Sequence, residues 1–262
     1  MLSILLLQST LLTNPVADGS LETVSTEPQP QPVGIFDTEE WSGRATVALT
    51  DVSGNSNSSN SAVNIDFAWE GDLDKIGLGA HYAGVRTTDK ATGIAATTSR
   101  LYQYDANYNR FFSEEKNLYG YINAGTRQDE PNGLQMRAST GLGVGNRFHM
   151  YELGEAKGEL NLEAGVSYVA ENKVGTLNET SGVGRAAFDF SGPVLENVSF
   201  NASGEYLNGG DIESYVQDIA LVWIFSEKFD LSISNSLAWD GNPSAGFSST
   251  DRRWNLLIGA NF

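Results

Sequence analysis

Apolar and polar residues alternate with a period of two from Trp41 to the end of the chain. Residues 63–70 read Val-Asn-Ile-Asp-Phe-Ala-Trp-Glu, so the apolar side chains share one face of an extended strand and most polar ones share the other. Twelve such runs follow one another, each roughly ten residues long, which is the length that a tilted strand needs to cross a bilayer. The pattern predicts an all-β domain over residues 41–262, with about twelve strands in an up-and-down meander.

The connections between the runs indicate how the strands are arranged. Those after the even runs are mostly short, whereas those after the odd runs are mostly long and rich in Gly, Ser, Asn and Thr. The predicted long connections are about 51–60, 87–99, 128–133, 170–181, 208–213 and 241–251, and the short ones are about 71–75, 112–116, 148–156, 192–196 and 226–228. Long loops at one end and short turns at the other are typical of outer-membrane β-barrels. The pattern predicts an even strand count, with both termini at the short-turn, periplasmic end.

The last run has the pattern of a closing strand. Its apolar face, expected to act as a barrel-assembly signal, consists of Trp254, Leu256, Ile258, Ala260 and Phe262. Only Leu257 breaks the alternation. An open sheet edge in lipid leaves backbone groups without hydrogen bonds, so we expect this strand to pair with the one that begins near Trp41 and to close an antiparallel transmembrane barrel.

The two faces differ in a way that favours lipid outside and water inside. The face opposite the apolar one carries charges in mid-strand, and these are expected to face the lumen: Arg44, Asp66, Arg137, Glu159, Glu163, Arg185, Asp189, Glu205, Asp218 and Arg253. Large aromatic residues near the strand ends are expected to form interfacial girdles: Trp69, Tyr82, Tyr168, Tyr206, Trp239, Trp254 and Phe262. For the run at 118–124, alternation does not decide between Leu118 and Tyr119 as the outer residue. A soluble β-sandwich binding module has the same alternation and remains an alternative.

Composition narrows the functional classes. The 262 residues carry a formal net charge of −17 and no cysteine, so no disulfide framework exists and clustered basic residues for nucleic acid are absent. No stretch of 18 apolar residues is present, and the mean hydropathy of −0.26 suits strands that are half polar. We expect outer-membrane lipid and the barrel-assembly machinery as partners, small solutes or ions as cargo, and no cofactor.

The first forty residues differ from the rest. An apolar run at 2–12 followed by Pro15-Val16-Ala17 resembles a signal peptide over residues 1–17, although no Lys or Arg precedes Arg44. Residues 18–40 are acidic and contain three prolines at alternate positions, Pro28, Pro30 and Pro32, which predicts a solvated leader or linker.

Several blocks resemble one known family. The segment 41–49 followed by Gly54-Asn55-Ser56, the segment 102–104 with 110–112, and the segments 116–121 and 141–145 are similar to the salt-induced outer membrane proteins, a YdiY-like domain family of unknown function. The resemblance covers about residues 41–262. It implies a Gram-negative outer-membrane barrel, and the family's biochemical activity is not established.

Few residue groups suggest chemistry. His81, on the lumen face, invites comparison with outer-membrane lipid hydrolases, but no G-x-S-x-G motif accompanies it. His149 is expected in a periplasmic turn. The glycines of 141–145 lack the Lys and Ser or Thr of a phosphate loop and are expected to relieve crowding inside the barrel wall. Neither Asp72 and Asp74 nor Asp129-Glu130 has the spacing of a calcium loop, and no metal site is predicted.

The sequence therefore supports one leading function and two alternatives. The leading one is a narrow channel that leans toward cations, because acidic groups outnumber basic ones on the lumen face, or a salt- and envelope-stress structural barrel whose lumen is plugged. A lipid-modifying enzyme of the outer membrane is the first alternative, and the soluble sandwich is the second.

Overall fold

The structure is a computed structural model that describes residues 41–52, 56–89, 92–154, 156–175 and 178–262. The predicted signal peptide at 1–17 and the predicted leader at 18–40 lie outside the described residues.

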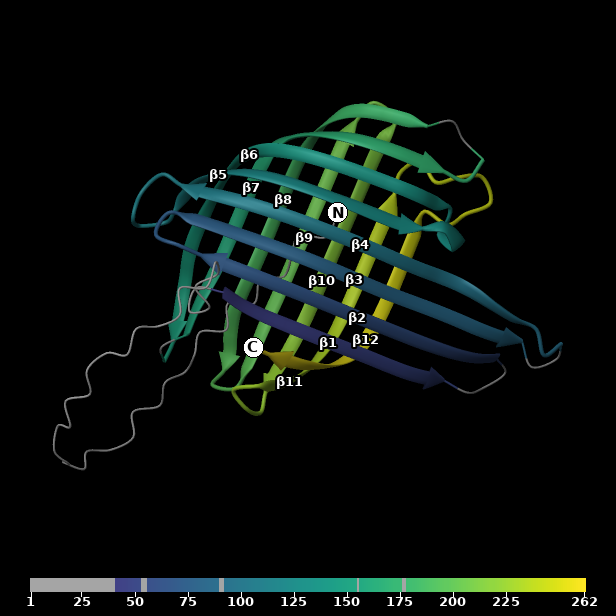
Figure 1. The fold of residues 1–262 in the computed structure, drawn as a ribbon, viewed down its shortest axis with the longest axis horizontal. Helices are drawn as coiled ribbons and strands as arrows, with labels where there is room; N and C mark the ends of the chain where they lie inside the picture. The colour runs from purple at the N-terminus through teal and green to yellow at the C-terminus, as the bar shows by residue number, and fades with distance from the viewer. Residues whose placement is uncertain (1–40, 53–55, 90–91, 155, 176–177) are drawn as a thin grey trace, which may run out of the picture.

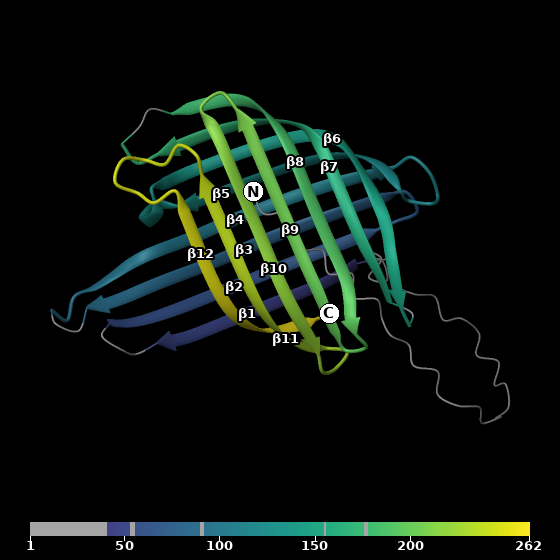
Figure 2. The same ribbon diagram turned by 180° about the vertical axis from the view of Figure 1, so that it is seen from behind.

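One sheet of twelve antiparallel strands makes up the fold, and it closes on itself (Figures 1 and 2). Every strand pairs with its two neighbours along the chain, and the first pairs with the last, so the predicted barrel and its strand count are confirmed. The strands are β1 (Trp41–Val52), β2 (Ser56–Glu70), β3 (Asp74–Asp89), β4 (Ala95–Phe111), β5 (Leu118–Asp129), β6 (Leu134–Leu153), β7 (Ala156–Lys173), β8 (Glu179–Leu195), β9 (Val198–Gly209), β10 (Ile212–Ile224), β11 (Phe229–Asp240) and β12 (Thr250–Asn261). A single 3-10 turn, η1 (Glu130–Asn132), lies between β5 and β6. Among the described residues, no helix has the length and apolar character needed to cross a membrane.

The closing pair of strands meets at the end that holds the C-terminus. Arg44 pairs with Asn261, and Val47 pairs with Ile258. Beyond them, the backbone of Gly43 exchanges two hydrogen bonds with Phe262, at 2.7 and 3.0 Å. The predicted closure between the last strand and the strand at Trp41 is therefore confirmed, and a soluble β-sandwich, which is two open sheets, is excluded.

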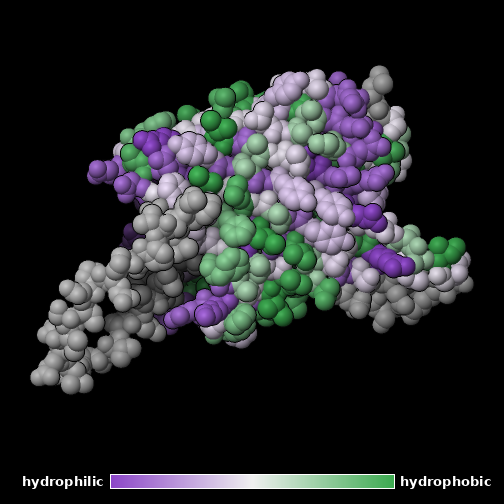
Figure 3. Space-filling model, viewed as in Figure 1, coloured by the Kyte–Doolittle hydropathy of each residue, from purple (hydrophilic) through white to green (hydrophobic). Residues whose placement is uncertain are grey.

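The wall has an apolar outside and a polar inside. Leu142 and Val166 expose 60% of their surface, and Ile258 exposes 62%. Figure 3 shows hydrophobic side chains gathered over the face that β1 to β4 form. The run that alternation left undecided is resolved by burial, because Tyr119 is 1% exposed inside the barrel while Leu118 lies outside at 49%. A closed wall with this polarity is the arrangement that a lipid bilayer requires.

The predicted loops are wrong in length, because the strands extend into them. β2 begins at Ser56 and β7 continues to Lys173, although both positions were assigned to loops. The predicted long loop at 208–213 is a tight connection, since β9 ends at Gly209 and β10 begins at Ile212. His149, predicted in a turn, lies within β6 and faces Glu159 at 3.4 Å. Strand ends that stand in water need no apolar face, so alternation stops before pairing does.

Candidate functional site

Alternation aims one side chain in two at the barrel axis, so all twelve strands contribute to the lumen. Charged side chains crowd it. Those less than 9% exposed are Lys75, Arg127, Asp129, Arg137, Arg147, Glu171, Lys173, Arg185, Glu205, Asp218 and Asp230. This polar interior is the only part of the described molecule that gathers charges from distant strands, which makes it the candidate site.

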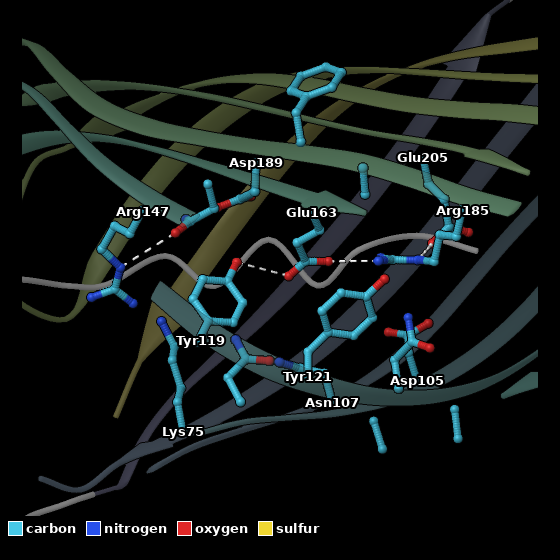
Figure 4. A pocket seen from close by; sticks show the side chains of 17 residues that line it. Lys75, Asp105, Asn107, Tyr119, Tyr121, Arg147, Glu163, Arg185, Asp189 and Glu205 are labelled. Carbon is cyan, nitrogen blue, oxygen red and sulfur yellow. Dashed lines mark hydrogen bonds and ion pairs between the residues drawn. The ribbon is translucent and has the colours of Figure 1, made fainter. Parts of the chain in front are cut away.

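A hydrogen-bonded chain crosses the lumen beside the first cavity (Figure 4). Tyr119 donates its hydroxyl proton to Glu163 at 3.0 Å, and Arg185 bridges Glu163 at 2.7 Å and Glu205 at 2.6 Å. The Arg185 guanidinium also lies over the Tyr121 ring, 4.8 Å from its centroid. Arg185 thus holds β5, β7 and β9 together through one side chain. The adjoining cavity contains about 750 Å³ of empty space, its open mouth included.

The second cavity contains about 1020 Å³ and lies beside β1, β2 and β12. At its border, His81 Nε2 lies 3.5 Å from an Asp66 oxygen and 3.3 Å from an Asp105 oxygen. Asp66 lines the second cavity and Asp105 lines the first, and no residue lines both. The imidazole and its two carboxylates therefore stand between the two cavities.

Ion pairs also brace both ends of the lumen. At the end that holds the C-terminus, Arg44 binds Asp230 at 3.1 Å, and Asn261 donates to the same carboxylate at 3.2 Å. At the opposite end, Arg253 binds Asp129. A cluster of ion pairs lies at this end too: Arg137 binds Glu171, and Lys173 binds both Glu171 and Asp240, each at 2.8 Å. A third cavity, with about 560 Å³ of empty space including its open mouth, lies beside this cluster.

Nine of the ten charged residues that the sequence placed on the lumen face expose less than a fifth of their surface, and the tenth, Asp189, is half-buried. Most of the ten have a partner. Arg44, Arg137, Arg185 and Arg253 each bind a carboxylate. Glu159 lies 3.8 Å from Arg147, Asp189 accepts from Asn161 at 3.3 Å, and Ser236 donates to Asp218. The structure thus joins these residues into several local networks rather than one.

Sequence reasoning missed seven of the eleven charged residues that are almost fully buried in the lumen. Lys75 and Arg147 continue the inward parity of runs that had been identified, so parity alone could have found them. Arg127 lies on β5, whose two faces alternation did not rank. Asp129, Glu171 and Lys173 had been assigned to loops, and no sequence signal showed that pairing continues that far.

The predicted aromatic residues occupy different heights on the wall. Trp69 pairs with Trp41 near the end that holds the C-terminus, and Phe262 contacts the Phe67 ring there, with centroids 5.9 Å apart. Toward the other end, Tyr206 and Trp239 both pair with Tyr215 on β10. Trp254 and Tyr168 are exposed on the outside. Tyr82 stands in the middle of β3, with its ring 5.3 Å from that of Tyr102.

The geometry gives little support to enzyme chemistry. His81 faces two carboxylates, and a Ser-His hydrolase requires a hydroxyl in that position. Over the described ranges, no group of three or more His, Cys, Asp or Glu side chains is arranged to hold a metal ion. Asp74 binds Arg110 and Tyr108 instead.

The comparison with family models decides the relationship. The model described as "Protein of unknown function, DUF481" matches residues 45–262. The chain belongs to this family. It is the YdiY-like family that the sequence blocks resembled. No curated protein matches the chain at a significant level.

Solved structures support the same fold. The COG4313 outer membrane channel from Pseudomonas putida F1 superposes with a TM-score of 0.50 at 12% identity, over 90% of this chain and 100% of that one. The NanC porin gives 0.47 at 9% identity over 85% and 98%, and the translocator domain of the autotransporter NalP from Neisseria meningitidis gives 0.41 at 12% over 85% and 87%. At 12% identity the likeness to the COG4313 channel shows the fold alone.

Proposed function

We propose that this protein is an integral outer-membrane barrel whose narrow lumen passes small ions and solutes with a preference for cations. The observation that carries the proposal is a closed wall, apolar outside, around a charged interior that still contains three cavities. Its expected surroundings are outer-membrane lipid, with both termini on the periplasmic side, and the barrel-assembly machinery during biogenesis.

The cation preference rests on the balance of charge. Buried or half-buried carboxylates outnumber the cationic groups in the described lumen, and several of them, such as Asp66 and Asp105, face no Lys or Arg within ion-pair distance. Unneutralised carboxylates in a narrow passage lower the energy of a cation there and raise that of an anion. A cation would therefore meet its lowest energy near His81, between the first and second cavities.

A plugged structural barrel is the second candidate, and one observation favours it. The first and second cavities share no lining residue, and His81 stands between them, within 3.5 Å of Asp66 in one and 3.3 Å of Asp105 in the other. In that case the charges hold the wall together, and the barrel contributes to the envelope under salt or other stress.

Single-channel recording of the full chain in a planar bilayer, across a gradient of potassium chloride, distinguishes the two. We expect small unitary currents whose reversal potential is shifted from zero toward the equilibrium potential of potassium. The double variant Asp66→Asn/Asp105→Asn should move that potential toward zero, whereas Asp211→Asn, in an exposed turn, should leave it unchanged. Silence supports the plugged barrel, and clear chloride selectivity overturns the cation proposal.

A further inference from the structure

The barrel seam between β1 and β12 is only partly closed. Ladder pairs join residues 44–47 to residues 258–261. From Ala48 onward β1 pairs only with β2, and from Leu257 back to Thr250 β12 pairs only with β11, as far as the described strands show. Both views show the two strands diverging away from the C-terminus (Figures 1 and 2). The wall therefore has a place where two strand edges face each other without hydrogen bonds.

Directly inside this seam the otherwise polar lumen wall carries an apolar patch. Leu257, the residue that breaks the alternation of the last strand, is 4% exposed and packs with Ala48 and Ala62. It lines the second cavity together with further small or aliphatic side chains. Those that are themselves buried are Ala62, Leu101, Val216 and Ala220. A water-filled ion pathway gains nothing from such a lining, but an apolar ligand does.

The same cavity contains a cation without a partner. Arg127 is 8% exposed, its Nε has no hydrogen-bond partner, and no carboxylate of the described chain lies within ion-pair distance of it. Two neighbouring carboxylates are engaged elsewhere, since Asp129 binds Arg253 and Ser99 while Asp218 accepts from Ser236. A third, Asp251, lines the same cavity but forms no ion pair with Arg127. A buried guanidinium that lacks a partner is costly, and an anionic group that accepts from it would remove that cost.

We propose that a single-chain amphipathic carboxylate of the fatty-acid type enters from the bilayer through the seam between β1 and β12. Its chain lies against Leu257 and the aliphatic side chains around it. Its carboxylate accepts hydrogen bonds from Arg127, whose planar donors fit two carboxylate oxygens. The lateral route crosses the wall at the seam, whereas the proposed ion pathway runs along the barrel axis and passes the same second cavity, so ligand entry and conductance are measured separately.

Binding to the full chain in lipid nanodiscs tests the ligand class, with dodecanoate as the probe and empty nanodiscs subtracted. We expect saturable binding with one site per barrel, at least tenfold weaker in Arg127→Gln and unchanged in Arg100→Gln, an exposed arginine. Dodecan-1-ol should bind the wild type at least tenfold more weakly than dodecanoate, a comparison that needs no variant. Absence of saturable dodecanoate binding, or equal affinity for the alcohol, overturns the proposal. Tighter binding of inorganic phosphate than of dodecanoate would also overturn it.

A cysteine pair tests the route. Extending the ladder places Leu49 opposite Leu256, both exposed on the outside, and the chain has no cysteine of its own. Leu49→Cys/Leu256→Cys, closed by oxidation or by a bis-methanethiosulfonate bridge, should slow the entry of dodecanoate from the bilayer at least tenfold, and reduction should restore it. The conductance should not change. Entry at the same rate through the bridged seam overturns the lateral route.

Discussion

Individual glycines decide how much aromatic volume the lumen holds. A Cβ built on Gly145 would lie 2.4 Å from the Tyr119 ring, and one on Gly143 would lie 2.7 Å from the Tyr121 hydroxyl. Tyr119 and Tyr121 are almost fully buried, and each reaches the network around Arg185. The expectation that the glycines of 141–145 relieve crowding is confirmed, and their role is to admit the two tyrosines.

Gly145→Ala should therefore destabilise the barrel by about 1–3 kcal/mol, because the buried Tyr119 ring must move to admit a methyl group. Gly182→Ala is the matched control. It is also a strand glycine, but nothing lies within 4 Å of its added Cβ. Urea titration of the protein folded in lipid vesicles measures both. Equal midpoints for the two variants would show that the wall adjusts freely around Tyr119.

At the scale of the strand, alternation predicted the strands and their closure, which the bilayer requires, and missed the strand ends, which it does not. Twelve strands and their closure follow from apolar side chains at every second position, and these are confirmed. Glu171 and Lys173 extend β7 beyond that pattern, held by Arg137 and Asp240 from other strands. Such pairings join residues far apart in sequence, so no local pattern reveals them. Alternation left open whether Leu118 or Tyr119 faces outward for a different reason, since both faces of β5 carry large apolar groups.

The orientation of a strand is testable at two adjacent positions. Leu162 is 45% exposed on the outer face of β7, and Asn161 faces inward, where it donates to Asp189. Leu162→Lys should cost about 2–4 kcal/mol if it lies near the middle of the bilayer, because the ammonium group must leave water. Asn161→Lys places the same group beside Asp189 and should cost much less. Unfolding from lipid vesicles gives both values, and equal costs would mean that the outer face does not contact lipid.

For the whole molecule, the critical interface is the one between the two ends of the chain. Eleven connections hold neighbouring strands together covalently. Between β1 and β12, in contrast, the backbone hydrogen bonds are confined to the ladder at residues 44–47 and the two at Gly43. Phe262 adds to it, since its ring packs against Phe67 and over Gly43, where a Cβ would lie 2.4 Å from the ring. Closure is thus concentrated in a few residues at one end of the seam.

Deleting Phe262 should lower the yield of closed barrel, because it removes both backbone hydrogen bonds to Gly43 and the ring that covers this end of the seam. Phe225→Ala is the control, since Phe225 is an exposed aromatic residue beside another turn at the same end of the barrel. The fraction of unheated protein that migrates as the compact form on a gel reports closure. We expect that fraction to fall in the deletion and to stay near the wild-type value in Phe225→Ala. A compact fraction equal to the wild type in the deletion would assign closure to the ladder at 44–47 alone.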